Sequence, residues 1–221
     1  MRAYFVTGTD TDVGKTYSCV ALLQAMALRG LATLGLKPVA AGAEMTRRGQ
    51  WRNDDALALR AASTCEVDYA ATNPYCLPAP LSPHIAAAQA GVSLTASAIA
   101  GSVTHTLDTA CADWVLVEGA GGWYVPINAS ETMADVARRL NLPVLLVVGM
   151  RLGCLNHALL TAEAIARDGL ALHGWIANCI DPQMTAIDDN IATLEARIPA
   201  PLVLRLNRNG LAESDISKSL I

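Results

Sequence analysis

The sequence has few charged residues, and its basic residues are not clustered. Charged side chains make up 16% of the 221 residues, the net charge is −4, and lysine and arginine form no run longer than the pairs at 47–48 and 138–139. A nucleic-acid-binding surface needs concentrated positive charge. We therefore expect no nucleic-acid partner.

Two further patterns are missing: cysteine pairs at metal or redox spacing, and long apolar segments. The six cysteines are scattered and form no C-x-x-C pair, which predicts neither a zinc cluster nor a disulfide framework. Free thiols are typical of a reducing compartment, so we expect a cytoplasmic protein. Apolar runs such as 144–148 are far too short to cross a bilayer, and we expect no membrane partner.

What is present is an alternation of short apolar segments with helix-like ones. Strands are predicted at 3–7, 33–37, 114–118, 144–149, 174–178 and 202–206, and helices at 15–29, 54–62, 95–111, 133–140, 156–168 and 185–197, with Gly30 and Gly169 placed to end two of them. This order predicts an α/β fold with a doubly wound, mainly parallel sheet flanked by helices, in one domain over residues 1–221. The proline-rich stretch 73–83 is predicted to be a long ordered loop. Ligands of such folds bind beyond the carboxyl ends of the strands.

A phosphate-binding loop is predicted between the first strand and the first helix, in the run GTDTDVGKT at 8–16. Gly14 would let the main chain approach phosphates, and the helix start offers free N–H groups. Lys15 would reach the β- and γ-phosphates, and the Thr16 hydroxyl would bind magnesium. The usual spacing has a glycine where this chain has Thr9, so the loop is a variant. It points to a nucleoside triphosphate.

Charged residues end the second and third predicted strands. Glu118 follows four apolar residues, as in a Walker B strand, and could complete a magnesium shell. The glycines at 119, 121 and 122 would let the backbone approach a substrate or a phosphate. Lys37 is either a second cation that stabilises phosphoryl transfer or a solvated lysine at a strand end.

Several other polar residues allow two interpretations. Asn53 or Asp54 is placed to cap a helix, and Asp55 is either a magnesium ligand or an ordinary first-turn carboxylate. Asn178 is either a contact for a purine edge or a turn residue before Asp181.

One further helix start offers an anion site. The free N–H groups from Gly153 to Asn156 would suit a carboxylate, with Cys154 as a small buried residue. His84 and His157 lie near helix starts and are assigned no proton-transfer role.

Taken together, these segments resemble the dethiobiotin synthetase family, a branch of the P-loop NTPases. The matching blocks are YFVTGTDT at 4–11, VGKT at 13–16, KPVA at 37–40, N-x-DALAL at 53–59, SPHI at 82–85, DWVLVEGAGGW at 113–123 and LGC-x-NHA at 152–158. They cover most of the chain and occur in the family's order.

The resemblance implies a homodimeric cyclo-ligase of biotin biosynthesis that uses ATP as co-substrate and Mg2+ as cofactor. CO2 adds to an amine of 7,8-diaminopelargonic acid to give a carbamate, which takes the γ-phosphoryl group of ATP. The second amine then closes the ring and releases phosphate, giving dethiobiotin and ADP.

The resemblance also implies the roles of individual residues. Lys37, Lys15 and Thr11 would be catalytic, and Thr16, Asp55 and Glu118 would bind magnesium. ATP would be bound by Asp12, Val13, Gly14, Lys15, Thr16, Tyr17, Asp55, Glu118, Gly119, Ala120, Gly121 and Asn178. Substrate would be bound by Ala41 and, near the subunit interface, by Gly153, Cys154, Leu155 and Asn156 of the other subunit.

The chain departs from the family pattern at four places. Asp12 replaces a glutamate, Ala41 a common serine, and Cys179 a common aspartate, while LRLNR at 204–208 replaces a Gly-Glu-Ile-Pro-Trp-like stretch. We expect an active enzyme with relaxed base selectivity. The alternative is a nucleotide-dependent switch of the partitioning type, whose hallmark is a lysine early in the phosphate loop, where this chain has Asp10-Thr11-Asp12.

Overall fold

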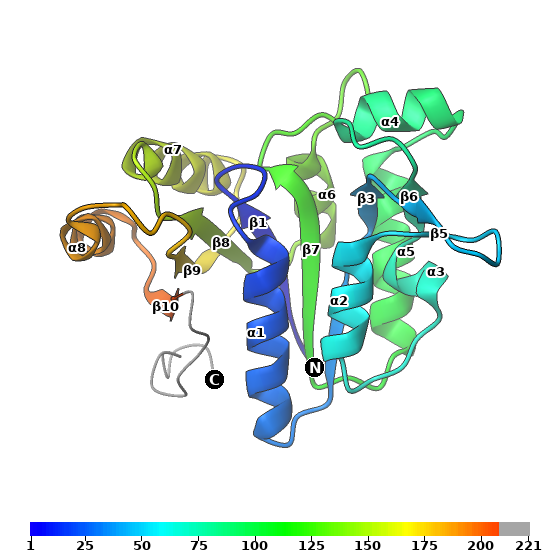
Figure 1. Cartoon of the computed structure of the whole chain (residues 1–221), viewed down its shortest axis with the longest axis horizontal. Helices are drawn as coiled ribbons and strands as arrows, with labels where there is room; N and C mark the ends of the chain where they lie inside the picture. Colours follow the sequence, from blue (N-terminus) through cyan, green and yellow to red (C-terminus); the bar gives the residue numbers. More distant parts are fainter. Residues whose placement is uncertain (208–221) are drawn as a thin grey trace.

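A six-stranded parallel sheet lies at the centre of the computed structural model, which describes residues 1–207 (Figure 1). The strand order is β10-β9-β8-β1-β7-β2, and each neighbouring pair is parallel. The strands are β1 (Arg2–Gly8), β2 (Thr33–Leu36), β7 (Trp114–Gly122), β8 (Val144–Gly149), β9 (Leu172–Asn178) and β10 (Leu202–Leu206). All six predicted strands are present, and the α/β fold class is confirmed.

Helices cover both faces of this sheet. They are α1 (Lys15–Leu28), α2 (Asp54–Ala62), α3 (Tyr69–Thr72), α4 (Pro83–Ala90), α5 (Ala96–Thr109), α6 (Met133–Leu140), α7 (Cys154–Arg167) and α8 (Ile187–Arg197). Successive strand residues point to opposite faces. Leu145 and Val147 therefore pack in the core formed with α1 and α2, whereas Leu146 and Val148 pack against α7 and α8. No helix within residues 1–207 is long and apolar enough to span a membrane.

The structure corrects several predicted boundaries. Helix α7 begins at Cys154 rather than at 156, because Gly153 adopts a φ of 94° at its N-cap. Helix α8 begins at Ile187, and β7 continues to Gly122. Gly30 and Gly169 have positive φ after α1 and α7, as predicted for helix ends.

The stretch 73–83 is not simply a loop, because it contains β6 (Tyr75–Leu77) and leads into α4. Strand β6 pairs in parallel with β3 (Val39–Ala41), while β4 (Glu44–Met45) and β5 (Trp51–Arg52) form an antiparallel pair. These strands have two or three residues each, too few for a periodic pattern. These segments are strands because they pair with one another. The small β3–β6 sheet contains β3, the strand that follows Lys37 along the chain.

The strand register brings the predicted site residues to one edge of the sheet. Leu36 pairs with Val117, so Lys37 and Glu118 follow on adjacent strands, and Val6 pairs with Glu118 just before the phosphate loop. On the other side of β1, Gly149 pairs with Asn178 at the ends of β8 and β9. The carboxyl ends of the strands therefore surround the N-terminus of α1 (Figure 1).

Candidate active site

The loop between β1 and α1 is held in place by contacts with distant strands. Gly14 has a φ of 83°, and a Cβ atom there would lie 2.0 Å from Asn178 Nδ2. That amide donates to the carbonyl oxygen of Val13 at 2.9 Å, and the N–H of Thr9 donates to the carbonyl of Val147. The N–H groups of the first turn of α1 have no partners within the helix. A glycine at 14 is thus required both by the backbone and by Asn178.

Lys15 is buried inside the phosphate loop. Its side chain is 7% exposed, and Nζ donates to the main-chain oxygen of Asp10 at 3.0 Å. Burial and the nearby cation of Lys37 lower the pKa of Lys15 to about 8. Anionic phosphates would reverse this effect, because they favour the charged form of the lysine.

We expect nucleotide binding to weaken above pH 8 as Lys15 loses its proton. Since the pKa is about 8 in the folded protein, against 10.5 for an ordinary lysine, roughly one tenth of the protein carries the charge at pH 9, and ADP affinity should fall about tenfold between pH 7 and pH 9. Between pH 8 and pH 10.5 the unfolded chain binds more protons at this residue, so the stability of the nucleotide-free protein should rise with pH there. Calorimetric titration with ADP measures the first effect.

Lys15→Arg is the control for this pH dependence, because a guanidinium stays charged across the range. If the variant binds, its affinity for ADP should not decline between pH 7 and pH 9. The same decline in the wild type and in the variant would contradict the assignment to Lys15.

Lys37 and Glu118 form a buried ion pair beside the phosphate loop. Lys37 Nζ contacts Glu118 Oε1, donates to the carbonyl oxygen of Gly119 at 3.3 Å and lies 3.4 Å from Asp55 Oδ2. Burial alone would lower the pKa of Lys37, but the carboxylates of Glu118 and Asp55 outweigh it, and the pKa is raised. Lys37 is therefore a fixed cation and not a solvated strand-end lysine.

Glu118 also has acceptor capacity that the protein does not use. Thr16 Oγ1 donates to Glu118 Oε1 at 2.9 Å, whereas Oε2 is buried and has no hydrogen-bond partner within residues 1–207. A buried carboxylate oxygen without a partner is costly. With the hydroxyl of Thr16 and the carboxylate of Asp55, it forms a set of hard oxygen donors, which fits the preference of magnesium.

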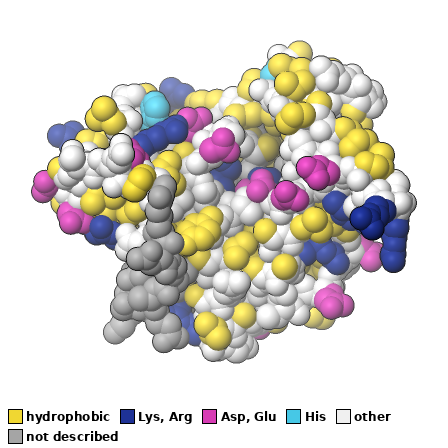
Figure 2. All heavy atoms as spheres, viewed as in Figure 1, with side chains coloured by type: hydrophobic (Ala, Val, Ile, Leu, Met, Phe, Trp, Pro, Cys, Tyr) yellow, Lys and Arg dark blue, Asp and Glu magenta, His cyan; other side chains and the backbone are white. Residues whose placement is uncertain are grey.

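Two cavities adjoin at this cluster. The first, of about 350 Å3, is lined by Thr11, Asp12, Gly14, Lys15, Thr16, Lys37, Asp55, Glu118 and Gly121. The second, of about 660 Å3, shares Thr11, Asp12, Lys37, Asp55 and Gly121 and is also lined by Ala41, Ala120 and residues 80–83. Figure 2 shows acidic and basic side chains gathered around a hollow near the middle of this face. One cavity thus faces the phosphate loop, and the other extends from Lys37 toward β3 and α4.

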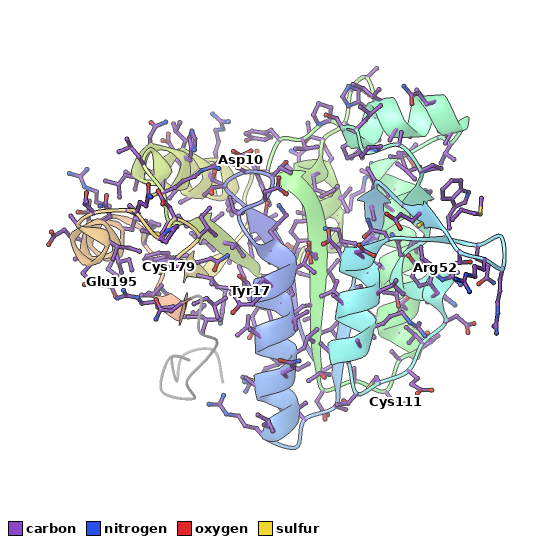
Figure 3. The ribbon with its side chains drawn as sticks, in the orientation of Figure 1. Asp10, Tyr17, Arg52, Cys111, Cys179 and Glu195 are labelled. Atoms are coloured by element: carbon purple, nitrogen blue, oxygen red, sulfur yellow. The ribbon has the colours of Figure 1, made fainter. Side chains whose placement is uncertain are left out.

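A third pocket, of about 310 Å3, lies on the other side of the phosphate loop and is lined by Tyr17, Asn178, Cys179, Ile180 and Asn207. Tyr17 approaches from α1 and Cys179 from the end of β9 (Figure 3). Because Asn178 donates to Val13, its Oδ1 atom remains as an acceptor at this pocket.

Two positions at which the chain departs from the family pattern, Cys179 and Asn207, line this pocket. Burial raises the pKa of the Cys179 thiol, against the opposing effect of Arg205. Arg205 in turn pairs with Asp188 Oδ1 at 2.6 Å. Arg208 lies outside the described residues.

The structure does not bring residues 153–156 to the cavities that Lys37 lines. They form the exposed start of α7, next to Leu152, which is 97% exposed, while Cys154 is buried as predicted. Asn53 rather than Asp54 caps α2, by accepting from the N–H of Ala56.

Sequence reasoning missed three residues near the site. Arg151 pairs with Asp10 Oδ2 at 2.6 Å (Asp10 is labelled in Figure 3), and its place after β8 could have pointed to it. Asn73 donates to the carbonyl oxygen of Lys37 at 2.6 Å, and the Tyr69 hydroxyl accepts from the N–H of Asn53. Tyr69 and Asn73 belong to a four-residue helix and its cap, for which the sequence has no signal.

The fold and this site define a P-loop nucleotide-binding protein. Solved structures with similar folds include the cell division protein FtsY of Thermotoga maritima (TM-score 0.57, 18% identity, covering 98% of this chain and 64% of that one). The MinC:MinD complex of Aquifex aeolicus is also similar (TM-score 0.58, 14% identity, 93% and 81%). At these identities the likeness concerns the fold alone.

Sequence relatives identify the family. A family model described as an AAA domain matches residues 2–214. The ATP-dependent dethiobiotin synthetase BioD of Cellvibrio japonicus is 55% identical over 99% of this chain and 94% of its own length. The protein of the same name from Pseudomonas paraeruginosa is 50% identical over 94% and 90%. The chain belongs to the ATP-dependent dethiobiotin synthetase family, and the resemblance inferred from the sequence is confirmed.

Proposed function

We propose that this protein is an ATP-dependent dethiobiotin synthetase, in which residues 1–221 act as one ligase domain. It would convert 7,8-diaminopelargonic acid, CO2 and ATP into dethiobiotin, ADP and phosphate. The observation that carries the proposal is the pair of buried lysines, Lys15 and Lys37, beside Glu118 at the phosphate loop. Relatives with 50–55% identity carry the same name.

ATP would bind along the N-terminus of α1. The free N–H groups of that helix and the ammonium of Lys15 would hold the β- and γ-phosphates once Lys15 leaves the carbonyl of Asp10. The pocket beside Tyr17 would take the base, where Asn178 Oδ1 could accept from an exocyclic amine. This contact suits adenine.

Thr16, Asp55 and Glu118 would hold Mg2+. The bound ion would neutralise charge on the phosphate oxygens during transfer. Because Glu118 Oε1 contacts both Lys37 and Thr16, the ligands and the second cation are held on adjacent elements. A small shift of these side chains would therefore change the positions of the magnesium ligands and of Lys37 together.

Lys37 would stabilise the charge that develops on the carbamate and on the transferred phosphoryl group. The carbamate forms when an amine nitrogen bonds to the carbon of CO2 and gives up a proton. A carbamate oxygen then bonds to the γ-phosphorus as the bond to ADP breaks. The second amine attacks the carbonyl carbon and gives up a proton, the bond from that carbon to the phosphate oxygen breaks, phosphate leaves, and the ring closes. Thr11 lines both cavities at which these groups would meet.

The diamine would lie in the cavity that extends past Ala41, and its carboxylate would be held by residues 153–156 of a second subunit. Two features support this homodimer: the exposure of Asn156 in the first turn of α7 and the 97% exposure of Leu152 just before that helix. The proposal also places the enzyme in the cytoplasm, where its co-substrate ATP is present and where its six free thiols would stay reduced.

Incubation of the purified protein with the diamine, bicarbonate, magnesium and ATP tests the proposal. Mass spectrometry should detect dethiobiotin and ADP, and omission of the diamine should abolish both. ATP hydrolysis that does not depend on the diamine, with no ring product, would contradict the proposal and favour the nucleotide-dependent switch.

A further inference from the structure

Three residues outside the phosphate loop form a continuous chain of hydrogen bonds that ends at Lys37. The main-chain N–H of Asn53 donates to the Tyr69 hydroxyl at 2.8 Å, and that hydroxyl donates to Asn73 Oδ1 at 3.1 Å. Asn73 Nδ2 then donates to the carbonyl oxygen of Lys37 at 2.6 Å. Asn53 and Asn73 are 7% and 2% exposed, so water does not readily replace these bonds.

The Asn53 side chain extends the same network in two directions. Its Oδ1 atom accepts from the N–H of Ala56 at 3.2 Å and so caps the helix whose first turn carries Asp55. Its Nδ2 atom donates to the carbonyl oxygen of Ala41 at 3.2 Å. One amide therefore connects the start of α2 to the end of β3, the strand that follows Lys37.

Tyr69 holds its position through its ring as well as its hydroxyl. The guanidinium of Arg52 lies 4.0 Å from the centre of the ring, and Cys76 Sγ lies 3.6 Å from the hydroxyl oxygen. Burial raises the pKa of Tyr69 to about 12, so the hydroxyl keeps its proton and can donate at working pH. The ring would keep its packing if the hydroxyl alone were removed.

We propose that Tyr69, Asn53 and Asn73 are positioning residues that fix Lys37 and Asp55 relative to each other at the transfer site. The two charged side chains come from different segments, Lys37 directly after β2 and Asp55 in the first turn of α2. Lys37 Nζ and Asp55 Oδ2 lie 3.4 Å apart, and both residues line the first cavity. The hydrogen-bonded chain joins the main chain of Asn53, at the start of α2, to the main chain of Lys37. The reaction assigned to the site rests on the proposed function, whereas the hydrogen bonds of the network do not depend on it.

The geometry makes a specific kinetic prediction. A displacement of about 1 Å between catalytic groups can slow a reaction by up to about a hundredfold. Nucleotide binding, in contrast, depends on the phosphate loop, which this network does not contact. Loss of the network should therefore lower kcat and raise the magnesium requirement, while the KM for ATP stays nearly constant.

Tyr69→Phe tests the proposal, since it removes one oxygen atom and keeps the ring. We expect kcat to fall about tenfold and the magnesium concentration for half-maximal activity to rise about threefold, with the KM for ATP within about twofold of wild type. Amide hydrogen exchange should increase in residues 37–56 and not in the phosphate loop. Tyr75→Phe is the matched control, because no hydrogen bond of its hydroxyl is found within residues 1–207; it should resemble wild type in every measurement.

Asn53→Ser is the second variant if Tyr69→Phe does not fold. A serine retains an acceptor for the helix cap but lacks the amide donor to Ala41, so it should show the same split between kcat and KM. Unchanged kcat in either folded variant, or a loss accompanied by faster exchange throughout the protein, would overturn the proposal. If wild-type protein forms no dethiobiotin, the proposed function fails, while hydrogen exchange in residues 37–56 of Tyr69→Phe still decides whether the network holds these residues in place.

Discussion

Lys37→Ala should abolish dethiobiotin formation, with a loss of about a thousandfold or more in kcat, while the protein remains folded. Lys37 is the buried cation closest to Glu118 and Asp55, and no other described lysine or arginine pairs with either carboxylate. Removal of a fixed cation from a site that excludes water typically costs two to three orders of magnitude per group. Product formation by mass spectrometry and circular dichroism measure the two effects.

The same substitution leaves Glu118 buried without its cation. Breaking a buried ion pair in this way costs about 3–5 kcal/mol unless the remaining group takes up a proton. The double variant Lys37→Ala/Glu118→Gln should therefore be more stable to urea than Lys37→Ala, yet just as inactive. Full activity of Lys37→Ala would show that the assignment of Lys37 to the reaction is wrong.

Gly14→Ala should abolish nucleotide binding, with the Kd for ADP raised about a hundredfold or more. Alanine pays about 1–2 kcal/mol in the left-handed region that Gly14 occupies at a φ of 83°. The added Cβ would also lie 2.0 Å from Asn178 Nδ2, so Asn178 must leave Val13 and the base pocket. Calorimetric titration with ADP in the presence of magnesium measures the loss.

Gly30→Ala separates these two causes. Gly30 has a φ of 80°, nearly the value at Gly14, but within residues 1–207 no heavy atom outside its chain neighbours lies within 4 Å of the position its Cβ would take. This variant should lose about 1 kcal/mol of stability and bind ADP normally. Comparable nucleotide affinity in Gly14→Ala and Gly30→Ala would contradict the role of the Gly14–Asn178 contact.

The fold class and the phosphate loop could be predicted from the sequence because both are written in consecutive residues. Parallel strands buried on both faces are short apolar runs, and a strand, a glycine-containing loop and a helix follow one another directly at residues 2–28. Glu118 and Asn178 were predicted as site residues in the same way, since each follows an apolar run. The start of α7 was predicted two residues too late, because the backbone geometry of Gly153, and not the apolar pattern, sets where this helix begins.

The role of a residue could not be decided from the sequence where it depended on a partner far away in the chain. Whether Lys37 is solvated or a buried cation depends on Glu118, which lies 81 residues later in the sequence. The contact of Asn178 with the phosphate loop depends on Val13, 165 residues earlier, and was neither of the two interpretations that the sequence allowed for Asn178. A local sequence pattern covers only neighbouring residues, so it cannot predict contacts between residues this far apart in the sequence.

Residue identity and local order thus determined the α/β fold, the nucleotide loop and the family to which the chain belongs. Only the tertiary structure decided that Lys37 is a buried, charged lysine, that Glu118 Oε2 is buried without a hydrogen-bond partner within residues 1–207, and that Tyr69 and Asn73 are hydrogen-bonded to each other and, through Asn73, to Lys37. The reason is physical: charge state and hydrogen-bond partnership depend on burial and on neighbours within a few ångströms, and folding brings those neighbours from separate elements.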